Sequence, residues 1–212
     1  MFERVELRVD DLATSQRFYA TVLGALGLAA TERDAWGDFA LAPADEDHPP
    51  TRGLHIGFTA PSRAAVDAFW EAGRRAGHDD DGPPGPRPQY VHDYYGAFLL
   101  DPDGNSAEAV HFGEVRHGAA VDHLWIRVAD LDAARAWYTA LAPAAGWRVR
   151  DSDATRVLVE RPDQTGSFAL VADERACTEH VRLAVAAADP ASAGVRHDPD
   201  GNEVELVGRR QP

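Results

Sequence analysis

The side chains that could do chemistry in this sequence are histidines, carboxylates and arginines, because the other common reactive groups are missing or isolated. All 21 of its Lys and Arg residues are arginine, which excludes a Schiff-base lysine and a P-loop lysine. Cys177 is the only cysteine, which excludes an intramolecular disulfide, a CxxC redox pair and a multi-cysteine zinc site. No serine stands in a GxSxG motif, which argues against an α/β-hydrolase triad. Nine histidines and 35 acidic residues remain as candidates for acid–base and metal chemistry.

The length and composition predict an acidic globular protein. Of its 212 residues 44% are hydrophobic, enough for a core, and the formal net charge of −14 disfavours nucleic acid and anionic membranes as partners. No apolar run approaches the roughly 18 residues of a membrane span. The first residues, MFERVELRVDDL, are typical of a strand rather than of a secretion signal. We therefore expect a cytoplasmic protein.

Two stretches of the sequence occur twice. The segment VELRVDDLATSQRFYATVL, which begins at Val5, recurs as LWIRVADLDAARAWYTALA, which begins at Leu124. The turn motif DPDGN occurs at 101–105 and again at 198–202. Self-similarity of this kind indicates a duplicated structural unit.

The repeats predict two homologous modules, residues 1–113 and 119–210, with the second one shortened. The first repeat has an offset of 119 residues and the second an offset of 97, so the second copy has lost chain between its landmarks. The connector GEVRHGAA is rich in small residues and has no periodicity. A glutamate follows each DPDGN turn at the same distance, Glu108 in the first module and Glu205 in the second.

Each module is predicted to begin with a strand and a helix. Apolar and charged residues alternate over 4–9, which predicts a strand with one buried face. An apolar stripe through Phe18 and Val22 predicts the following helix, with Thr14 or Ser15 as its N-cap.

A second strand–helix unit follows in the first module. LHIGFTA (54–60) and GAFLL (96–100) predict strands, and a helix is expected after Ser62. The proline-rich segment GPPGPRP (82–88) is interpreted as a stiff connector. The predicted fold class is therefore α+β, with helices on one face of a sheet and the other face free to hold a ligand.

These motifs together resemble the vicinal oxygen chelate superfamily, which includes glyoxalase I, bleomycin-resistance proteins, fosfomycin-modifying enzymes and extradiol dioxygenases. The resemblance rests on the DL…FY pattern of the first strand–helix, on LHIGFTAPSRAAVDAFWEAG and on YYGAFLLDPDGNSAEAVHF. It implies two tandem βαβββ-repeat modules, the second one truncated. In such modules a cupped sheet holds a divalent metal, and the ligands come from the first strand of each half and from the last strand of the second half.

The resemblance implies a metal site in the second module. His123, His180 and Glu205 occupy its three ligand positions, and two histidines with one carboxylate form the facial triad that suits Fe²⁺, Mn²⁺, Zn²⁺ or Ni²⁺. Glu205 is also predicted to be catalytic. Strand alternation places further residues on the same faces, and we expect them in the substrate pocket: Trp125, Arg127 and Arg182.

The first module departs from this pattern. Its corresponding residues are Arg4, His55 and Glu108, and an arginine stays protonated and cannot ligate a metal. We expect an Arg4–Glu108 ion pair in place of the metal, in a pocket with Tyr94 near its mouth that suits an acidic or phenolic molecule. His92 is a candidate general acid or base, or alternatively a surface loop histidine.

The resemblance leaves several functions open. The first is a divalent-metal-dependent lyase, isomerase or dioxygenase acting on a small oxygenated molecule. The second is a metal-free protein that binds and sequesters an antibiotic, in which case the predicted ligands are polar residues of a solvated cup. The third is a non-catalytic accessory subunit. Tandem modules predict a monomer with an internal pseudo-dimer, and a homodimer is the alternative.

Overall fold

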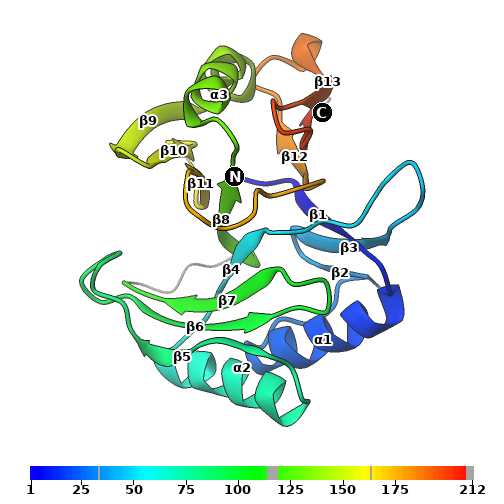
Figure 1. Ribbon diagram of the computed structural model, residues 1–212, viewed down its shortest axis with the longest axis vertical. Helices are drawn as coiled ribbons and strands as arrows, with labels where there is room; N and C mark the ends of the chain where they lie inside the picture. Colours follow the sequence, from blue (N-terminus) through cyan, green and yellow to red (C-terminus); the bar gives the residue numbers. More distant parts are fainter. Residues whose placement is uncertain (33, 114–118, 163, 209–212) are drawn as a thin grey trace.

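The computed structural model describes residues 1–32, 34–113, 119–162 and 164–208, which form two β-sheets and three α-helices (Figure 1). In the first half of the chain the elements are β1 (Arg4–Val9), α1 (Leu12–Ala25), β2 (Ala35–Trp36), β3 (Phe39–Pro43), β4 (His55–Thr59), α2 (Arg63–Arg75), β5 (Asp80–Pro86), β6 (Tyr95–Leu100) and β7 (Ser106–His111). In the second half they are β8 (Val121–Arg127), α3 (Leu131–Ala145), β9 (Arg148–Asp153), β10 (Arg156–Glu160), β11 (Ser167–Val171), β12 (Arg182–Ala186), a 3₁₀ turn (Pro190–Ser192), β13 (Gly194–His197) and β14 (Glu203–Val207).

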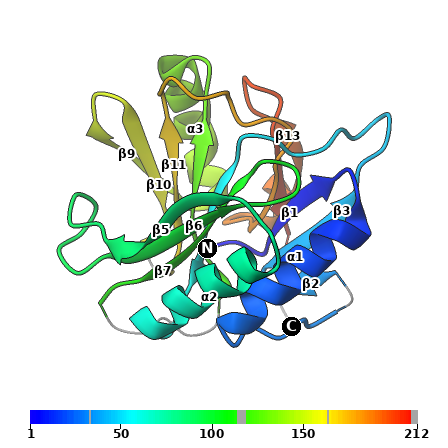
Figure 2. The same ribbon diagram turned by 60° about the horizontal axis from the view of Figure 1, so that its bottom comes forward.

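The fold is the predicted α+β arrangement of two tandem modules, and the second module is shortened as expected. In the second module the 3₁₀ turn Pro190–Ser192 stands where the first module has the helix α2. The helices α1 and α2 lie side by side, and α3 lies at the other end of the molecule (Figures 1 and 2). The module boundaries stay a prediction, because residues 114–118 of the connector, together with 209 and 210, lie outside the described residues.

Each sheet combines strands of both modules. The six-stranded sheet has the order β13-β14-β12-β1-β3-β2, and the eight-stranded sheet has the order β5-β6-β7-β4-β8-β11-β10-β9. The modules meet where β1 pairs antiparallel with β12 and where β4 pairs antiparallel with β8. The second half of the first module therefore faces the first half of the second module, and a site in either sheet draws residues from both.

An aspartate at the end of the first strand caps the first helix of each module. Asp11 accepts a hydrogen bond from the backbone N–H of Thr14 (3.0 Å), and Asp130 does the same for Ala133 (3.0 Å). The prediction that Thr14 or Ser15 caps this helix is wrong, because Asp11 has the extended backbone of an N-cap and its carboxylate reaches the orphan donors first. Capping explains why this aspartate recurs in both repeats.

In each module, the DPDGN turn connects the first helix to the second half of that module through hydrogen bonds. In the first module the Tyr19 hydroxyl donates to Asp101 (2.9 Å), and the Asn105 side-chain carbonyl accepts the backbone N–H of Leu54 (3.1 Å). The second module repeats both contacts at 3.0 and 3.1 Å with Tyr138, Asp198, Asn202 and Val181. These repeated residues are structural, and Leu54 and Val181 are thereby shown to be equivalent positions.

The predicted strands agree with the structure, but one segment predicted to be a connector forms a strand. Along β8 the side chains of Leu124 and Ile126 are fully buried in the core, as their alternation predicts. The interpretation of GPPGPRP as a connector is wrong, because most of it belongs to β5, which pairs with β6 through two register shifts. Prolines are tolerated there since β5 is an edge strand. Among the described residues we find no helix whose length and hydropathy suit a membrane span.

Candidate metal centre

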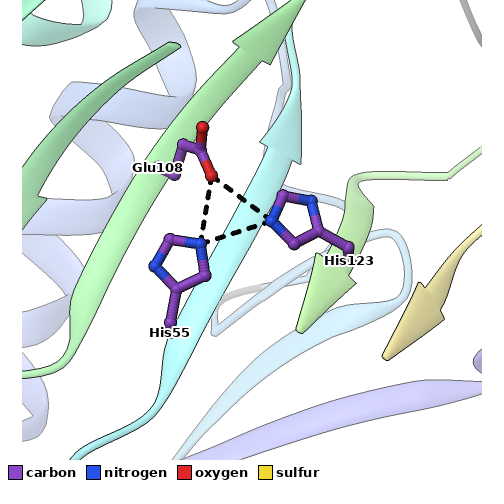
Figure 3. Close-up of side chains that lie close together, drawn as sticks. All are labelled: His55, Glu108 and His123. Carbon is purple, nitrogen blue, oxygen red and sulfur yellow. Dashed lines mark hydrogen bonds and ion pairs between the residues drawn. The ribbon is translucent and has the colours of Figure 1, made fainter. Parts of the chain in front are cut away.

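Two imidazoles and one carboxylate converge on the eight-stranded sheet (Figure 3). His55 lies on β4, Glu108 on its parallel neighbour β7, and His123 on its antiparallel neighbour β8. Glu108 Oε2 lies 3.0 Å from His55 Nε2 and 3.3 Å from His123 Nε2, and the two Nε2 atoms lie 3.3 Å apart. Within the described chain, this is the one cluster of three or more His, Cys, Asp or Glu side chains with convergent ligand atoms.

Two glycines leave room for these side chains. A Cβ atom added to Gly57 would lie 2.4 Å from the His123 ring, and one added to Gly96 would lie 2.4 Å from Glu108 Oε1. Both distances are far below a van der Waals contact, so any larger residue would displace a candidate ligand. The absence of a side chain at these positions is therefore part of the site.

Hydrogen bonds orient both imidazoles with Nε2 toward the centre. The Ser106 hydroxyl donates to Asp81 (2.6 Å), so it accepts from His55 Nδ1, which lies 3.2 Å away. His123 Nδ1 lies 2.9 Å from the Asp122 carboxylate and donates to it. With both Nδ1 hydrogens engaged, each Nε2 is left to bind a proton or a metal, which is the usual arrangement around ligating histidines.

In the absence of metal, a proton on His123 balances the charge of Glu108. Burial by itself raises the pKa of Glu108, but hydrogen bonds with His123 and His55 outweigh it and lower this pKa to about 2. Burial lowers the pKa of His123, yet its hydrogen bonds with Asp122 and Glu108 raise it to about 10. Burial lowers the pKa of His55 despite the adjacent Glu108. The resting site thus holds a neutral His55, an ionised Glu108 and a cationic His123.

The donor set and its dimensions fit a divalent ion. Two ligands at about 2.1 Å from one ion lie about 3 Å apart when their bonds meet near a right angle. The three separations of 3.0 to 3.3 Å agree with this value. Tyr94 donates to Glu108 Oε1 (2.8 Å), which leaves Oε2 as the carboxylate atom directed at the centre. The residues present could therefore hold Fe²⁺, Mn²⁺, Zn²⁺ or Ni²⁺ as a facial triad with open positions.

Two pockets adjoin the candidate centre. The first has a volume of about 230 Å³ and is lined by His55, Asp81, Arg87, Tyr90, Phe98, Ser106, Glu108, Trp125, Arg127, Asp173 and Arg175. The second has a volume of about 460 Å³ and reaches His123 from the side of Tyr94 and Arg156. Trp125 and Tyr90, whose rings meet edge to face at 5.6 Å, line both pockets. These two rings therefore form the wall between them.

A family model decides the relationship of the chain to known proteins. The model of the Glyoxalase/Bleomycin resistance protein/Dioxygenase superfamily matches residues 2–109, which is just over half of the chain. The chain belongs to this superfamily. A search of curated proteins found no match.

Several solved structures are similar to this chain. Glyoxalase I from Zea mays is 17% identical with a TM-score of 0.67, and the match covers 97% of this chain and 91% of the maize chain. A glyoxalase/bleomycin resistance protein from Albidiferax ferrireducens T118 is 36% identical with a TM-score of 0.47, and that match covers 53% of this chain and 99% of the other. The likeness to the maize protein shows that the two-module fold is shared.

The candidate ligands come from both modules rather than from one. His55 and Glu108 come from the second half of the first module, and His123 comes from the first strand of the second module. The predicted grouping of His123 with His180 and Glu205 is wrong, because His180 and Glu205 belong to the other sheet region. The predicted residue types are nevertheless those of the observed cluster.

The structure does not bring His180 to the cluster, because His180 lies two residues before the position that corresponds to His55. Leu54 and Val181 make the same hydrogen bond with their DPDGN asparagines, so His55 corresponds to Arg182. His180 precedes β12, is exposed and has a positive φ of 59°, and its carbonyl accepts from the Thr51 hydroxyl. Neither histidine spacing nor alternation reveals this register, because the asparagine contact sets it.

The six-stranded sheet contains an arginine-centred cluster in place of a histidine site. Arg182 lies 2.5 Å from Glu203, 2.8 Å from Glu205 and 3.4 Å from Glu6. Arg4 lies on β1 of this same sheet and lines a pocket of about 290 Å³ with Arg182 and Glu205. The expected Arg4–Glu108 ion pair is therefore wrong, as are the placement of Arg4 in a pocket with His55 and that of Glu205 in a metal site.

The remaining predicted residues divide into two groups. Trp125 and Arg127 line the first pocket, and Tyr94 lines the second and orients Glu108, so all three lie at the centre. Their substrate-binding roles stay predictions. His92 is exposed in the loop before β6, and it does not line either of these pockets. The structure does not bring His92 to the centre as a general acid or base.

Proposed function

We propose that this protein is a divalent-metal-dependent enzyme that acts on a small molecule through two adjacent oxygens of that molecule. The observation that carries the proposal is the convergence of His55 Nε2, His123 Nε2 and Glu108 Oε2 within 3.3 Å of one another. A divalent ion held there would supply Lewis acidity and open positions for substrate oxygens. The reaction class that this supports is that of a lyase, isomerase or dioxygenase.

The protein's own residues orient the ligands and shape the space next to them. Ser106 and Asp122 fix the two rings through Nδ1, and Tyr94 fixes Glu108 through Oε1. Burial raises the pKa of Tyr94, and so does its bond to Glu108, so its hydroxyl keeps its proton and continues to donate. Bound substrate would lie in the first pocket, which His55 and Glu108 line together with Arg87, Arg127 and Arg175.

One observation favours a metal-free binding protein as the second candidate. The cationic His123 pairs with Glu108 at 3.3 Å, so the cluster is balanced in charge without any metal. A protein with this pair intact could bind and sequester a small molecule in the adjacent pockets. The two candidates differ in whether a divalent ion displaces the His123 proton at neutral pH.

The experiment is a measurement of bound metal in purified full-length protein and its variants. The protein is purified, exposed to Fe²⁺, Mn²⁺, Zn²⁺ or Ni²⁺, desalted and analysed by elemental mass spectrometry. Near-stoichiometric metal is expected in the wild type, with loss of metal in His55→Ala and His123→Ala. The matched controls are His180→Asn, which tolerates the positive φ, and Glu205→Gln, and both should retain the metal.

Each outcome of this measurement decides the proposal. A wild type that binds no ion under metal-replete conditions would overturn the enzyme in favour of the metal-free binding protein. Equal loss of metal in His123→Ala and in either control would overturn the assignment of the ligands. The assignment of the ligands is supported when the wild type and both controls retain the metal and the two histidine-to-alanine variants lose it.

A further inference from the structure

Three arginines line the pocket beside the candidate metal centre, although the chain as a whole is strongly acidic. Arg87, Arg127 and Arg175 come from three separate segments, and the formal net charge of the chain is −14. A concentration of positive charge in a cleft attracts anions locally even when the rest of the surface repels them. We infer that the substrate is a small carboxylic acid that also carries two adjacent oxygens, an inference that rests on the function proposed above.

Only one of the three arginines is neutralised. Arg127 is buried and pairs with Asp173 at 3.1 Å. In the part of the chain that the structure describes, Arg87 and Arg175 form no ion pair. The remaining carboxylate of the pocket outside the candidate centre is Asp81, which accepts the Ser106 hydroxyl. Glu108 also lines the pocket but belongs to the candidate centre, where it pairs with His123 at 3.3 Å. The part of the pocket outside that centre therefore has two unpaired arginines against one carboxylate, which is an excess of positive charge.

Arg87 is held in place while it keeps donors for a ligand. Its guanidinium lies over the Phe98 ring at 5.5 Å, and it donates to the carbonyls of Pro83 (2.8 Å) and Pro86 (3.2 Å). A guanidinium has five N–H donors, so these two hydrogen bonds leave others for the pocket. A planar group fixed in this way is pre-organised for a carboxylate, which accepts hydrogen bonds from arginine in pairs.

The pocket limits the size and shape of the acid. Its volume of about 230 Å³ is below the roughly 300–1,000 Å³ of pockets that hold drug-sized ligands. Phe98 and Trp125 flank His55, with ring centroids at 5.8 and 5.2 Å from the imidazole. A flat molecule of about one ring fits this space. Its paired oxygens would face the candidate ligands, and its carboxylate would face Arg87 and Arg175.

The test compares an acid with its neutral analogue on the zinc-loaded full chain. Zinc is redox-inert, so binding is measured without turnover. The probes are protocatechuate, a catechol that carries a carboxylate, and the corresponding amide, each titrated by calorimetry. The wild type is expected to bind the acid about tenfold more tightly than the amide. One hydrogen bond to a charged group contributes about that factor in affinity. Equal affinities for the acid and the amide would overturn the inference.

Variants assign the preference to the two unpaired arginines. Arg87→Gln and Arg175→Gln are each expected to reduce the preference for the acid, and the double variant to abolish it. Arg175→Lys should keep part of it, because Lys retains the charge. Arg17→Gln on α1 is the matched control, since Arg17 is exposed and its side chain donates to the Thr14 hydroxyl (2.8 Å), and it should keep the full preference. A double variant with an unchanged preference would overturn the inference.

The zinc content of the same samples separates this inference from the proposed function. All the arginine variants should retain zinc, because no arginine is a candidate ligand. A wild type that retains neither zinc nor any of the other three ions contradicts the proposed function by its own measurement. The comparison of acid with amide on that protein still decides whether the pocket prefers an anion.

Discussion

The two sheets contain equivalent strands but different clusters of charged side chains. The strands β12, β14 and β1 pair with one another as β4, β7 and β8 do, with one parallel and one antiparallel neighbour. The registers therefore relate the two sheets residue by residue. Arg182 corresponds to His55, Arg4 to His123, Glu205 to Glu108 and Ala184 to Gly57.

The difference between the two clusters is the difference between a fixed cation and an exchangeable one. Arg182 keeps its proton at all accessible pH values and sits among three glutamates. The burial of Arg182 opposes its charge, but the charges of those glutamates raise its pKa further. His123 holds a proton that a divalent ion can displace. One scaffold thus supports a permanent ion pair in one sheet and a candidate metal centre in the other.

A single methyl group reinforces the difference. Gly57 lies against the His123 ring, and any Cβ there would approach the ring to 2.4 Å. The equivalent residue in the six-stranded sheet is Ala184, which already has that Cβ. The arginine-centred cluster therefore also lacks the space that a ligating ring needs at this position.

The largest expected effect comes from placing the arginine of one sheet into the other. His123→Arg should abolish metal binding, because a guanidinium stays protonated and, like the equivalent Arg4 in the other sheet, cannot ligate a metal. Elemental analysis and thermal unfolding measure metal and folding separately. A folded His123→Arg protein that still binds near-stoichiometric metal would contradict the comparison.

The reverse exchange should create a second centre. Arg4→His, Ala184→Gly and Arg182→His together place two imidazoles beside Glu205 and remove the blocking methyl group. The metal-to-protein ratio is expected to rise by up to one ion per chain relative to the wild type. Arg182→His alone is the control, and it should leave the ratio unchanged because Arg4 still carries a fixed charge. An unchanged ratio in a folded triple variant would show that the sheets differ in more than these residues.

The glycine beside His123 should be the next most sensitive position. Gly57→Ala is expected to weaken metal binding by about 10- to 100-fold, the range seen when groups that orient metal ligands are disturbed. Titration with a competing chelator measures the change. Gly24→Ala on α1 is the control, since a Cβ there meets nothing within 4 Å. Equal affinities in the two variants would contradict a steric role for Gly57.

The metal-free protein should lose stability as the pH rises, because the pKa of His123 is higher in the folded than in the unfolded state. The folded value is about 10 and the reference value 6.5, so this contribution is complete below pH 6.5 and is lost as pH approaches 10. Urea unfolding of chelator-treated protein at several pH values measures it. His123→Gln cannot take up this proton, and its stability should vary less over the same range.

The smallest effect is expected at the serine that orients His55. Ser106→Ala removes the acceptor of His55 Nδ1 and should weaken metal binding by about tenfold. The same competition titration measures it, with Ser192→Ala in the other sheet region as control. An affinity equal to that of the control would show that Ser106 does not hold the ring.

Much of the fold could be predicted from local patterns. Alternation along β1 and β8 and the apolar stripe of α1 predicted elements that the structure contains, because such patterns report burial of one face. The N-cap and the strand β5 were missed for different reasons. Asp11 competes with two other good caps nearby, and prolines in a strand are allowed only when that strand lies at an edge.

The sequence predicted the residue types of the cluster but not which residues form it. Two histidines and a glutamate do form the cluster, yet only His123 of the three predicted ligands belongs to it. His180 was misplaced because the contact of Asn202 with Val181, between residues far apart in sequence, sets the register of β12. A shift of two residues preserves strand parity, so alternation gives no warning of it.

The amino-acid sequence by itself determined the duplicated α+β modules and the shortening of the second. It also determined the residue types available for chemistry, with arginine as the only permanently charged cationic side chain. Only the tertiary structure decided that each sheet is built from both modules, and therefore that His55 and Glu108 meet His123 while Arg182 meets the glutamates. The physical reason is that pairing of distant strands depends on contacts between them, and these contacts leave no periodic trace along either strand. Because the sequence contains no lysine, every permanently charged cation in these clusters is an arginine, and the pairing of the strands decides where that arginine lies.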